Sequence, residues 1–397
     1  MRSLSPIRYT MALPRTAVVA HGSRLGHPQS QSHGDFGPQT GVGEILSPSP
    51  DQAESWNYAL NDDTVHMVIH RSDYHKVLWD TAKELGVEPS LGAEVVKVDY
   101  DKTEVTLASS ETLSVDIVIG ADGLWSVARD SILQCPSPPT ETRDLAYRVT
   151  VSIEQIEALD DASVTELCSQ SGVTTWMGPQ CHCVFYPVRD NTEFNIVLLV
   201  PDTLEHGVSR AEGDFAEMMA AFEDWDDRLV KMLSQVTSVE KWKLCHHAEL
   251  ESWKKNAVAL LGDAFHPTLP YQVQGAAMAV EDGAVLGRLL GLLKTSTKDT
   301  STMQERIPGL LKLYESLRKR RTTASVLGAV ANRKWFHLAD GPLQEARDGA
   351  MAASCSEVTE QESWSFLSDE YQAEMLGFDA VEDCELAFHR WFSEAYG

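Results

Sequence analysis

Two aspartates of this sequence directly follow short apolar runs, and each has a glycine beside it. Asp122 and Gly123 end the stretch DIVIGADG, and Gly262 and Asp263 follow the apolar run in AVALLGDA. Continuous apolar runs of this length predict strands buried on both faces of a parallel sheet, and such sheets bind ligands beyond the carboxyl ends of their strands. A carboxylate at that edge accepts hydrogen bonds from ribose or ribityl hydroxyls, and glycine lets the backbone approach the ligand closely.

The segment that follows Asp263 continues this pattern. His266 and a proline form a stiff bend, and Gly275 and Ala276 then open a predicted helix. The free N–H groups and the positive dipole end of such a helix suit a phosphate, or a ring that gains negative charge when it is reduced. In the alternative interpretation each aspartate only caps the helix after it, but two Gly-Asp pairs at buried strand ends favour a cofactor site. His266 precedes a proline, so we expect a structural role for it rather than general-base catalysis.

The elements that must position these residues indicate an α/β protein with a β-rich insertion. A strand-to-helix turn contains His70 and Arg71, and residues 94–109 predict a hairpin. Between residues 141 and 250 the texture changes to the alternating strands of an antiparallel sheet with two short helices, and the buried-strand texture then returns. The predicted antiparallel strands are 145–153, 182–188 and 193–200, and the predicted helices are 124–133, 214–225, 227–236, 275–293 and 309–330.

Composition and charge exclude several classes of protein. With 397 residues and a formal charge of -26, the chain would repel the phosphates of a nucleic acid. No apolar run approaches the ~20 residues that span a bilayer. The basic run LRKRRTT (317–323) predicts a solvated helix face rather than a nucleic-acid site. The clusters at 181–183 and 245–247 combine cysteine and histidine, but neither has the second half of a zinc site, so we expect no metal.

The first 60 residues differ from the rest of the chain. Residues 1–34 contain four arginines and no lysine or acid, and three prolines interrupt any long amphipathic helix. We expect an atypical, poorly ordered leader over residues 1–60 rather than a mitochondrial targeting sequence. The seven scattered cysteines are typical of a reduced, cytoplasmic protein.

Three fingerprints, in order along the chain, resemble those of the single-component FAD-dependent aromatic hydroxylases. IHRSDYHKVL (69–78) resembles their arginine-bearing turn, DIVIGADGLWSVAR (116–129) is similar to their Asp-Gly motif, and the stretch 262–282 is similar to their second FAD fingerprint. YESLRKRR (314–321) and FHLADGPLQEARDGAM (336–351) resemble the fungal salicylate-hydroxylase-like branch of that family. Three ordered matches in one chain make this resemblance specific.

The resemblance implies roles for particular residues. Arg148, in AYRVTV, would act on the substrate, and Tyr186, in VFYPV, would line the substrate cavity. Considered without the fingerprints, Arg148 would be an exposed strand cation and Arg71 a surface arginine at a helix start. NAD(P)H would approach the cofactor near Asp122 and Arg129. The residues that would bind FAD are Arg71, Asp122, Gly123, Arg129, Gly262, Asp263, Gly275 and Ala276.

The resemblance also implies a fold and a reaction. The fold is α/β: an incomplete Rossmann-like FAD-binding domain at 61–140 and 251–330, interrupted by a β-rich substrate domain at 141–250 and followed by a helical C-terminal tail at 331–397. The reaction is monooxygenation with NAD(P)H and O2, in which a C4a-hydroperoxyflavin hydroxylates a phenolic or related aromatic substrate of secondary-metabolite type. A flavin epoxidase is a related alternative.

One expected part of the FAD site is missing from the sequence. The family begins with a strand, a G-x-G-x-x-G turn that seats the pyrophosphate, and a helix. Residues 16–26 and 37–46 contain glycines, but neither stretch is expected to replace this unit and its strand. The chain is interpreted as a truncated or mis-started form of an enzyme, a diverged member or a noncatalytic remnant, and we expect it to bind FAD weakly or not at all.

Overall fold

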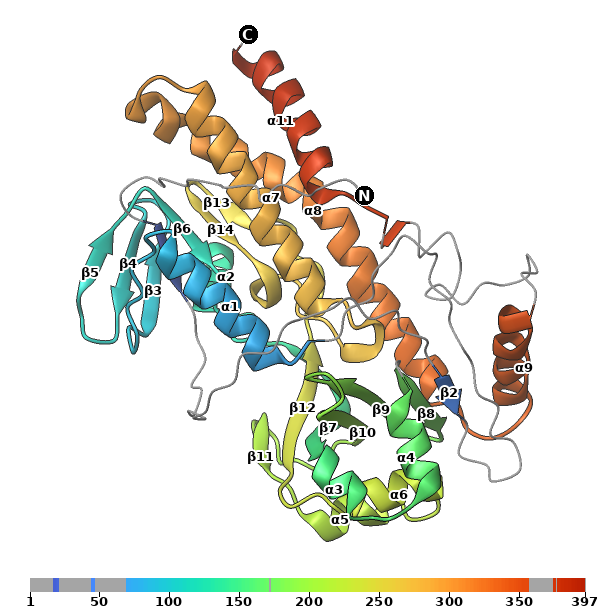
Figure 1. The fold of residues 1–397 in the computed structure, drawn as a ribbon. Helices are drawn as coiled ribbons and strands as arrows, with labels where there is room; N and C mark the ends of the chain where they lie inside the picture. Colours follow the sequence, from blue (N-terminus) through green and yellow to red (C-terminus); the bar gives the residue numbers. More distant parts are fainter. Residues whose placement is uncertain are drawn as a thin grey trace.

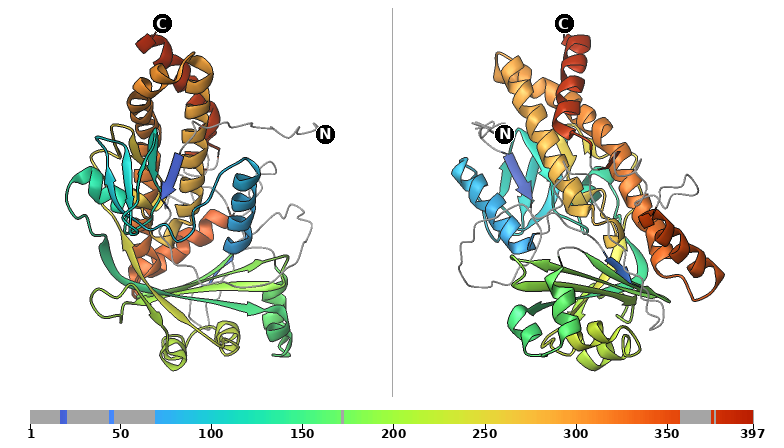
Figure 2. Two further views of the ribbon diagram at one scale, coloured as in Figure 1. Left: turned by 90° about the vertical axis from the view of Figure 1, so that its left-hand side faces the viewer. Right: turned by 45° about the vertical axis from the view of Figure 1, so that its right-hand side comes forward.

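The computed structural model describes residues 17–20, 44–46, 69–170, 173–356, 374–375 and 377–396. Most of the leader expected at residues 1–60, with its glycine-containing turns, lies outside these residues. Figures 1 and 2 show a lower part built on a large sheet, and an upper part dominated by three long helices. One of these helices, α8, continues from the upper part down to the sheet.

A small sheet with parallel strands lies in the upper part. Its order is β1 (Ala17–Ala20), β6 (Ile117–Gly120), β14 (Val258–Leu260) and β13 (Lys254–Lys255). β6 and β14 are buried along their whole length, as their continuous apolar sequence predicts. The parallel strands end level with one another, because Gly120 pairs with both Leu260 and Ala20. β1 falls within residues 16–26, where the sequence offers a short strand, and it pairs in parallel with β6.

Three long helices pack against this sheet and against one another. Their bounds are α7 (Gly275–Ser296), α8 (Thr300–Phe336) and α11 (Ala380–Tyr396). Leu289, Tyr314 and Phe388, one from each helix, are fully buried in a core that also contains Ile117 of β6. α8 is longer at both ends than the predicted helix and continues through Pro308.

A seven-stranded sheet forms the centre of the lower part. Its order is β11 (Arg210–Glu212), β12 (Glu240–His246), β7 (Thr140–Ser152), β10 (Glu193–Pro201), β9 (Cys181–Val188), β8 (Thr174–Gly178) and β2 (Glu44–Leu46). Four short helices cover its lower face in Figure 1: α3 (Ile153–Glu157), α4 (Ala162–Ser169), α5 (Phe215–Ala220) and α6 (Asp227–Leu233). The predicted β-rich texture is confirmed, although each element differs from its predicted bounds.

Side chains of this sheet alternate between two different environments. In β10, Phe194, Ile196 and Leu198 are fully buried in the core that the four short helices cover. Asn195 and Val197 belong to the opposite face, because successive side chains of a strand point to opposite sides. Val197 packs against a third core, which joins the sheet to α8 and to the segment before α7. We call this opposite face the open face of the sheet.

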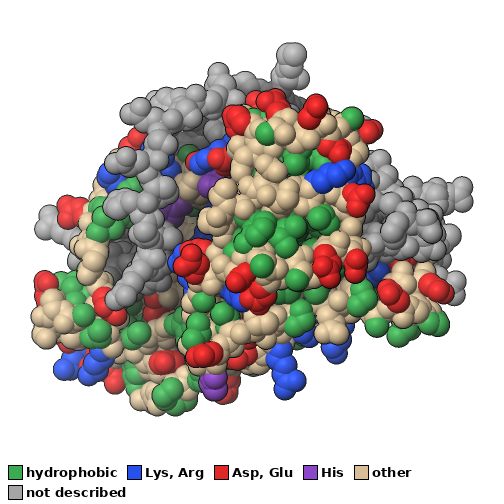
Figure 3. Space-filling model, turned by 90° about the horizontal axis from the view of Figure 1, so that it is seen from below, with side chains coloured by type: hydrophobic (Ala, Val, Ile, Leu, Met, Phe, Trp, Pro, Cys, Tyr) green, Lys and Arg blue, Asp and Glu red, His purple; other side chains and the backbone are tan. Residues whose placement is uncertain are grey.

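The remaining elements lie around the small sheet. They are α1 (Arg71–Glu84), the three-stranded sheet β3 (Val95–Asp99), β4 (Glu104–Leu107) and β5 (Thr112–Ser114), α2 (Val127–Leu133), the short 3-10 turns η1 (Gly262–Ala264) and η2 (Pro270–Gln272), and α9 (Pro342–Ser356). The hairpin predicted at 94–109 is confirmed. None of the helices within the described ranges is apolar enough over a sufficient length to cross a bilayer. On the face drawn in Figure 3, acidic side chains are spread over the described surface, as the net charge leads one to expect.

The basic run at 317–323 is solvated only in part, because Arg320 is exposed but two of its arginines are buried. Arg318 is fully buried, with its Nε 2.8 Å from Asp282 Oδ1 and its Nη2 2.7 Å from Glu281 Oε2. Arg321 is also buried and donates two hydrogen bonds of 2.8 Å to Glu281. The reason lies in helical spacing: these arginines are three residues apart, share one side of α8 and meet an acidic pair on α7.

Candidate active site

The turn after β14 is held by one buried carboxylate. Asp282 of α7 is completely buried, accepts a hydrogen bond from the Gly262 N–H at 3.2 Å and lies 2.6 Å from His266 Nε2. Its second oxygen accepts from Arg318. Gly262 has a φ of +61°, a conformation that glycine adopts without strain. The turn that carries Asp263 is therefore fixed by α7 and α8, and buried His266 is part of that support.

Asp263 itself is exposed, and the charge of Arg71 acts on its carboxylate. Solvent reaches its side chain, yet the protein that surrounds the carboxylate raises its pKa, while the charges of His266 and Arg71 oppose this rise. No hydrogen bond to this carboxylate is made within the described chain. Asp263 is thus free to accept hydrogen bonds from a ligand, at the carboxyl edge of the parallel strands where the sequence predicts one.

Arg148 of the large sheet lies close enough to Arg71 for the two charges to act on each other. It lies on the open face of β7, and its guanidinium is 5.7 Å from the centre of the Trp242 ring. Desolvation, and then the positive charge of Arg71, lower its pKa. Among the described residues, neither Arg71 nor Arg148 forms an ion pair, although both side chains are exposed. Two uncompensated cations that face each other attract an anion.

Tyr186 of β9 shares the open face with Arg148, and β10 lies between their two strands. Burial raises the pKa of its hydroxyl, and both the charge of Arg148 and the amide of Asn195 oppose the rise. Four of the residues singled out from the sequence, Arg71, Arg148, Tyr186 and Asp263, are therefore brought into one electrostatically coupled group. They come from α1, from two strands of the large sheet and from the turn after β14.

The amino-terminal end of α7 also belongs to this region. Its cap residue, Gln274, makes no side-chain cap hydrogen bond, so the side chain does not occupy the first N–H groups of the helix. Ala276 is exposed. A Cβ added to Gly275 would lie 3.1 Å from Thr268 Cγ2, so a larger residue would crowd the segment that leads into the helix. The available N–H groups and the helix dipole suit a negatively charged ligand.

The first Gly-Asp turn has a different arrangement. Asp122 accepts hydrogen bonds from Ser126 Oγ at 2.5 Å and from the Ala128 N–H at 3.1 Å, so it caps the start of α2. This is the alternative that the sequence left open for both aspartates. Gly123 has a φ of +78°, which the sharp turn requires.

Arg129 joins the two Gly-Asp turns from inside the protein. Its side chain is almost completely buried and donates hydrogen bonds to three backbone carbonyls: Leu124 and Ser137 beside α2, and Ala264 in the second turn. Arg129 therefore stabilises the conformation of both turns from within the protein.

Sequence patterns missed several residues of this region. Arg189, in the turn between β9 and β10, bonds to Asp73 in the first turn of α1. Asn195 and Trp242 lie on the open face, and each has a buried side-chain N–H that lacks a partner within the described chain. Strand alternation assigns such residues to a face, but only the register shows which of them surround Arg148.

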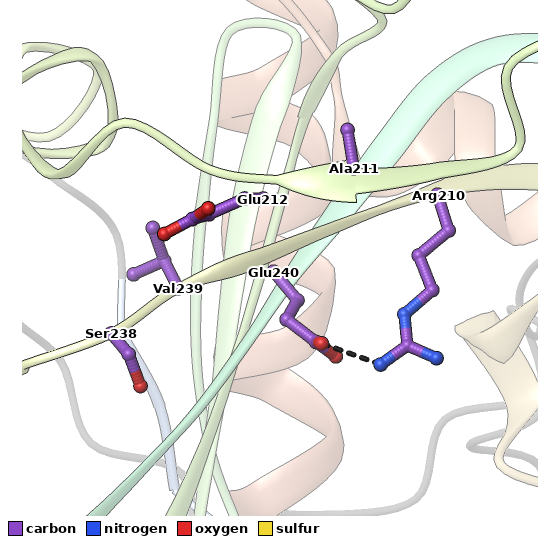
Figure 4. A pocket seen from close by; sticks show the side chains of 6 residues that line it. All are labelled: Arg210, Ala211, Glu212, Ser238, Val239 and Glu240. Atoms are coloured by element: carbon purple, nitrogen blue, oxygen red, sulfur yellow. Dashed lines mark hydrogen bonds and ion pairs between the residues drawn. The ribbon is translucent and has the colours of Figure 1, made fainter. Parts of the chain in front are cut away.

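A separate pocket lies at the outer edge of the large sheet. Figure 4 shows its lining residues, which are Arg210, Ala211, Glu212, Ser238, Val239 and Glu240. Arg210 and Glu240 form an ion pair of 2.5 Å across the strands, so the two charges satisfy each other. Glu212 forms no ion pair among the described residues, so the pocket offers an anionic ligand no uncompensated cation, in contrast to the surroundings of Arg148.

Comparison with known proteins assigns this arrangement to a family. The FAD binding domain family matches residues 31–326. The chain is 38% identical over 336 residues to the FAD-dependent monooxygenase OpS4 of Beauveria bassiana (strain ARSEF 2860), which covers 83% of this chain and 76% of that protein. The chain belongs to the FAD-dependent aromatic hydroxylase family. This flavoprotein hydroxylase uses FAD as its cofactor, and the expectation drawn from the three fingerprints is confirmed.

Other relatives of the hydroxylase agree with this assignment. The 3-hydroxybenzoate 6-hydroxylase of Klebsiella oxytoca is 29% identical over 277 residues, 69% of this chain and 65% of that protein. A solved structure described as a salicylate hydroxylase substrate complex has the same fold, with a TM-score of 0.68 and 22% identity over 87% of this chain and 82% of that one. The predicted α/β fold is thereby confirmed, while the domain limits stay a prediction.

The residues present fit FAD on structural grounds. The carboxylate of Asp263 accepts no hydrogen bond within the described chain. The start of α7 has no side-chain cap, and its first residue is Gly275. Together these provide acceptors for sugar or ribityl hydroxyls and donors for the negatively charged parts of the cofactor.

Proposed function

We propose that this flavoprotein hydroxylates a phenolic or related aromatic substrate that carries an acidic group, with NAD(P)H and O2 as co-substrates. The observation that carries the proposal is the guanidinium of Arg148 on the open face, which has no ion-pair partner among the described residues and whose pKa is lowered by desolvation and by the charge of Arg71. An arginine without a carboxylate partner in such a partly desolvated position favours the binding of an anion, and its planar donor fork matches a carboxylate or phenolate. The hydroxybenzoate-acting relatives support the same substrate class.

The cofactor would be held by residues around the turn after β14. Asp263 would accept hydrogen bonds from FAD hydroxyls, the N–H groups at Gly275 and Ala276 would face its negatively charged parts, and Arg71 would lie between cofactor and substrate. Bound FAD supplies the redox chemistry, since it takes a hydride from NAD(P)H and reacts with O2. The positive end of α7 would stabilise negative charge that develops during reduction.

The substrate would be oriented by the open face of the large sheet. Arg148 would bind the acidic group and lower the pKa of a neighbouring phenol, which makes the ring more electron-rich. Burial raises the pKa of Tyr186, so this residue keeps its proton and remains a hydrogen-bond donor at neutral pH. The apolar side chains beside these groups, such as Val197, exclude water from the reacting ring.

A kinetic comparison tests the proposal. The protein is supplied with excess FAD, and NADPH oxidation is followed with and without hydroxybenzoates. We expect the aromatic acid to stimulate oxidation, and the product to contain one oxygen atom from isotopically labelled O2. Arg148→Ala should lower the substrate-stimulated rate roughly 10–100-fold, as expected for a lost charge-assisted hydrogen bond.

The control for this test is Arg320→Ala, because Arg320 lies on α8 with its side chain 89% exposed. Equal losses in the two variants would remove Arg148 from the active site, and an unlabelled product would reject monooxygenation. We also propose a cytoplasmic location, supported by the free state of the six cysteines in the described chain.

A further inference from the structure

Asn195 occupies the middle of β10, between two residues of the buried core. Phe194 and Ile196 are fully buried beneath the sheet, so strand alternation puts the Asn195 side chain on the open face. The register makes Tyr186 its cross-strand neighbour on one side and Thr150 its neighbour on the other. Asn195 therefore lies on the open face, beside Tyr186 and on the strand next to that of Arg148.

The side-chain amide of Asn195 has donor capacity that the protein does not fill. The amide lies near enough to the Tyr186 hydroxyl to lower its pKa, but its buried Nδ2 makes no well-formed hydrogen bond among the described residues, and the residue as a whole is partly exposed. Buried polar groups of folded proteins nearly always have a partner. Val197, two residues along on the same face, shows that this surface accepts an apolar side chain. The terminal torsion of asparagine is soft, so the amide can turn toward a ligand that lies on the sheet.

The position of Asn195 relative to Arg148 indicates which part of a ligand the amide meets. Arg148 pairs with Val197, so it lies diagonally across from Asn195 on the adjacent strand. Diagonal neighbours in an antiparallel pair are roughly 7–8 Å apart at the backbone, which is within the reach of long side chains such as that of arginine. A single ring can therefore reach both side chains.

We propose that Asn195 determines substrate specificity by donating a hydrogen bond to a ring hydroxyl oxygen of the substrate whose acidic group Arg148 binds. This inference rests on the proposed function, because it requires an aromatic acid that binds to Arg148 on the open face. A site with an unpaired donor at this place selects ring-hydroxylated acids over the same acids without the hydroxyl, since the unhydroxylated ligand leaves the amide unsatisfied.

A ligand-binding comparison tests the inference. Salicylate, 3-hydroxybenzoate and benzoate are titrated into the FAD-loaded protein, and the change in flavin fluorescence gives each Kd. We expect at least one hydroxybenzoate to bind about 10-fold or more tightly than benzoate. Asn195→Leu removes this preference and leaves the Kd of benzoate unchanged. Asn195→Asp keeps the shape of the side chain but removes the donor, so it carries the test should leucine disturb the sheet.

Thr150→Val is the matched control, since it removes a polar group from the other cross-strand neighbour and should leave the preference intact. Flavin content and melting temperature are recorded for every variant. A preference that survives in both Asn195 variants overturns the inference while the proposed function stands. A wild-type protein that binds none of the three acids, and whose NADPH oxidation none of them stimulates, rejects the proposed substrate class itself.

Discussion

Arg189 and Asp73 join the turn between β9 and β10 to the first turn of α1 through two parallel hydrogen bonds. Nε donates to Oδ2 at 2.8 Å and Nη2 donates to Oδ1 at 3.0 Å. Arg71, the first residue of α1, is thereby tied to the same sheet that carries Arg148 and Tyr186. The turn itself is unusual, because three consecutive residues, 189–191, have positive φ without being glycine. Such backbone persists where the surrounding contacts impose it.

Breaking this pair is expected to weaken FAD binding more than stability. Both side chains are about one-third exposed, at 37% and 35%, so the pair should contribute only about 0.2–1 kcal/mol to folding. Arg189→Met should raise the Kd for FAD several-fold, because α1 is no longer fixed at its start. Arg210→Met is the control, since it breaks an exposed pair at the far edge of the sheet. An FAD titration that gives the same Kd for both variants contradicts this view of the pair.

Removal of the buried carboxylate of Asp282 should be far more damaging. Asp282→Ala leaves buried Arg318 with Glu281 alone as its ion-pair partner and releases the Gly262 N–H and His266. The loss of one member of a buried ion pair costs about 3–5 kcal/mol. Urea unfolding should show this loss, while Asp80→Ala, which breaks an exposed pair with Lys76 on α1, should leave the unfolding midpoint almost unchanged. Similar unfolding midpoints for the two variants would refute the supporting role of Asp282.

We expect the position of Gln272, in the segment before α7, to depend on the absence of a side chain at Gly328. A Cβ on Gly328 would come within 2.0 Å of Gln272 Nε2, whereas a Cβ on Gly291 of α7 meets nothing within 4 Å. Gly328→Ala should therefore displace Gln272 and weaken FAD binding. Gly291→Ala should be neutral or stabilise the protein by roughly 0.5–1 kcal/mol, because alanine favours helix over glycine. Flavin fluorescence titrations and thermal melts of the two variants decide the matter, and equal FAD affinities would show that Gln272 is not coupled to the site.

Stability should fall as the pH decreases from about 6.5 to about 4. His337 lies 2.8 Å from buried His182, and burial lowers its pKa to about 4, with Asp144 opposing the shift and Arg333 reinforcing it. Because the folded pKa lies below the unfolded one, the unfolded state binds more protons in this interval, and the stabilising effect is lost as the pH falls. His337→Gln should flatten this part of the stability curve in urea titrations at pH 7 and pH 5. His389→Gln serves as the control, and an unchanged slope in His337→Gln would exclude the histidine pair as the cause.

Local sequence was sufficient to predict the strands that end at the two Gly-Asp pairs, because a short continuous apolar run before a glycine has few alternatives. The resemblance to a family, and not local sequence, predicted Arg71 and Asp263 as members of one site, and their roles stay a prediction. Local sequence did not predict that Arg318 and Arg321 are buried. A basic run on a helix looks the same whether water or an acidic pair on another helix faces it, and only the packing of α7 on α8 decides.

The open face of the large sheet was beyond local patterns for a related reason. Alternation divides β10 into two sets of side chains, but it does not reveal which set meets the cofactor region or which residue of a neighbouring strand lies opposite. Asn195 and Trp242 therefore remained unnoticed, although Arg148 and Tyr186 were named. The expectation of weak FAD binding also stays a prediction, and an absorbance spectrum of the purified protein measures it directly.

The continuity of α8 has a mechanical consequence. Tyr314 of this helix is buried against the parallel sheet, and Trp335, near its other end, is buried against the seven-stranded sheet. Because one continuous helix is buried in both cores, a hinge motion that separates the two sheets would have to break its packing in one of them. We therefore expect reactants to enter and leave through small rearrangements of the chain segments around Arg148 and Asp263, while the two sheets keep their mutual orientation.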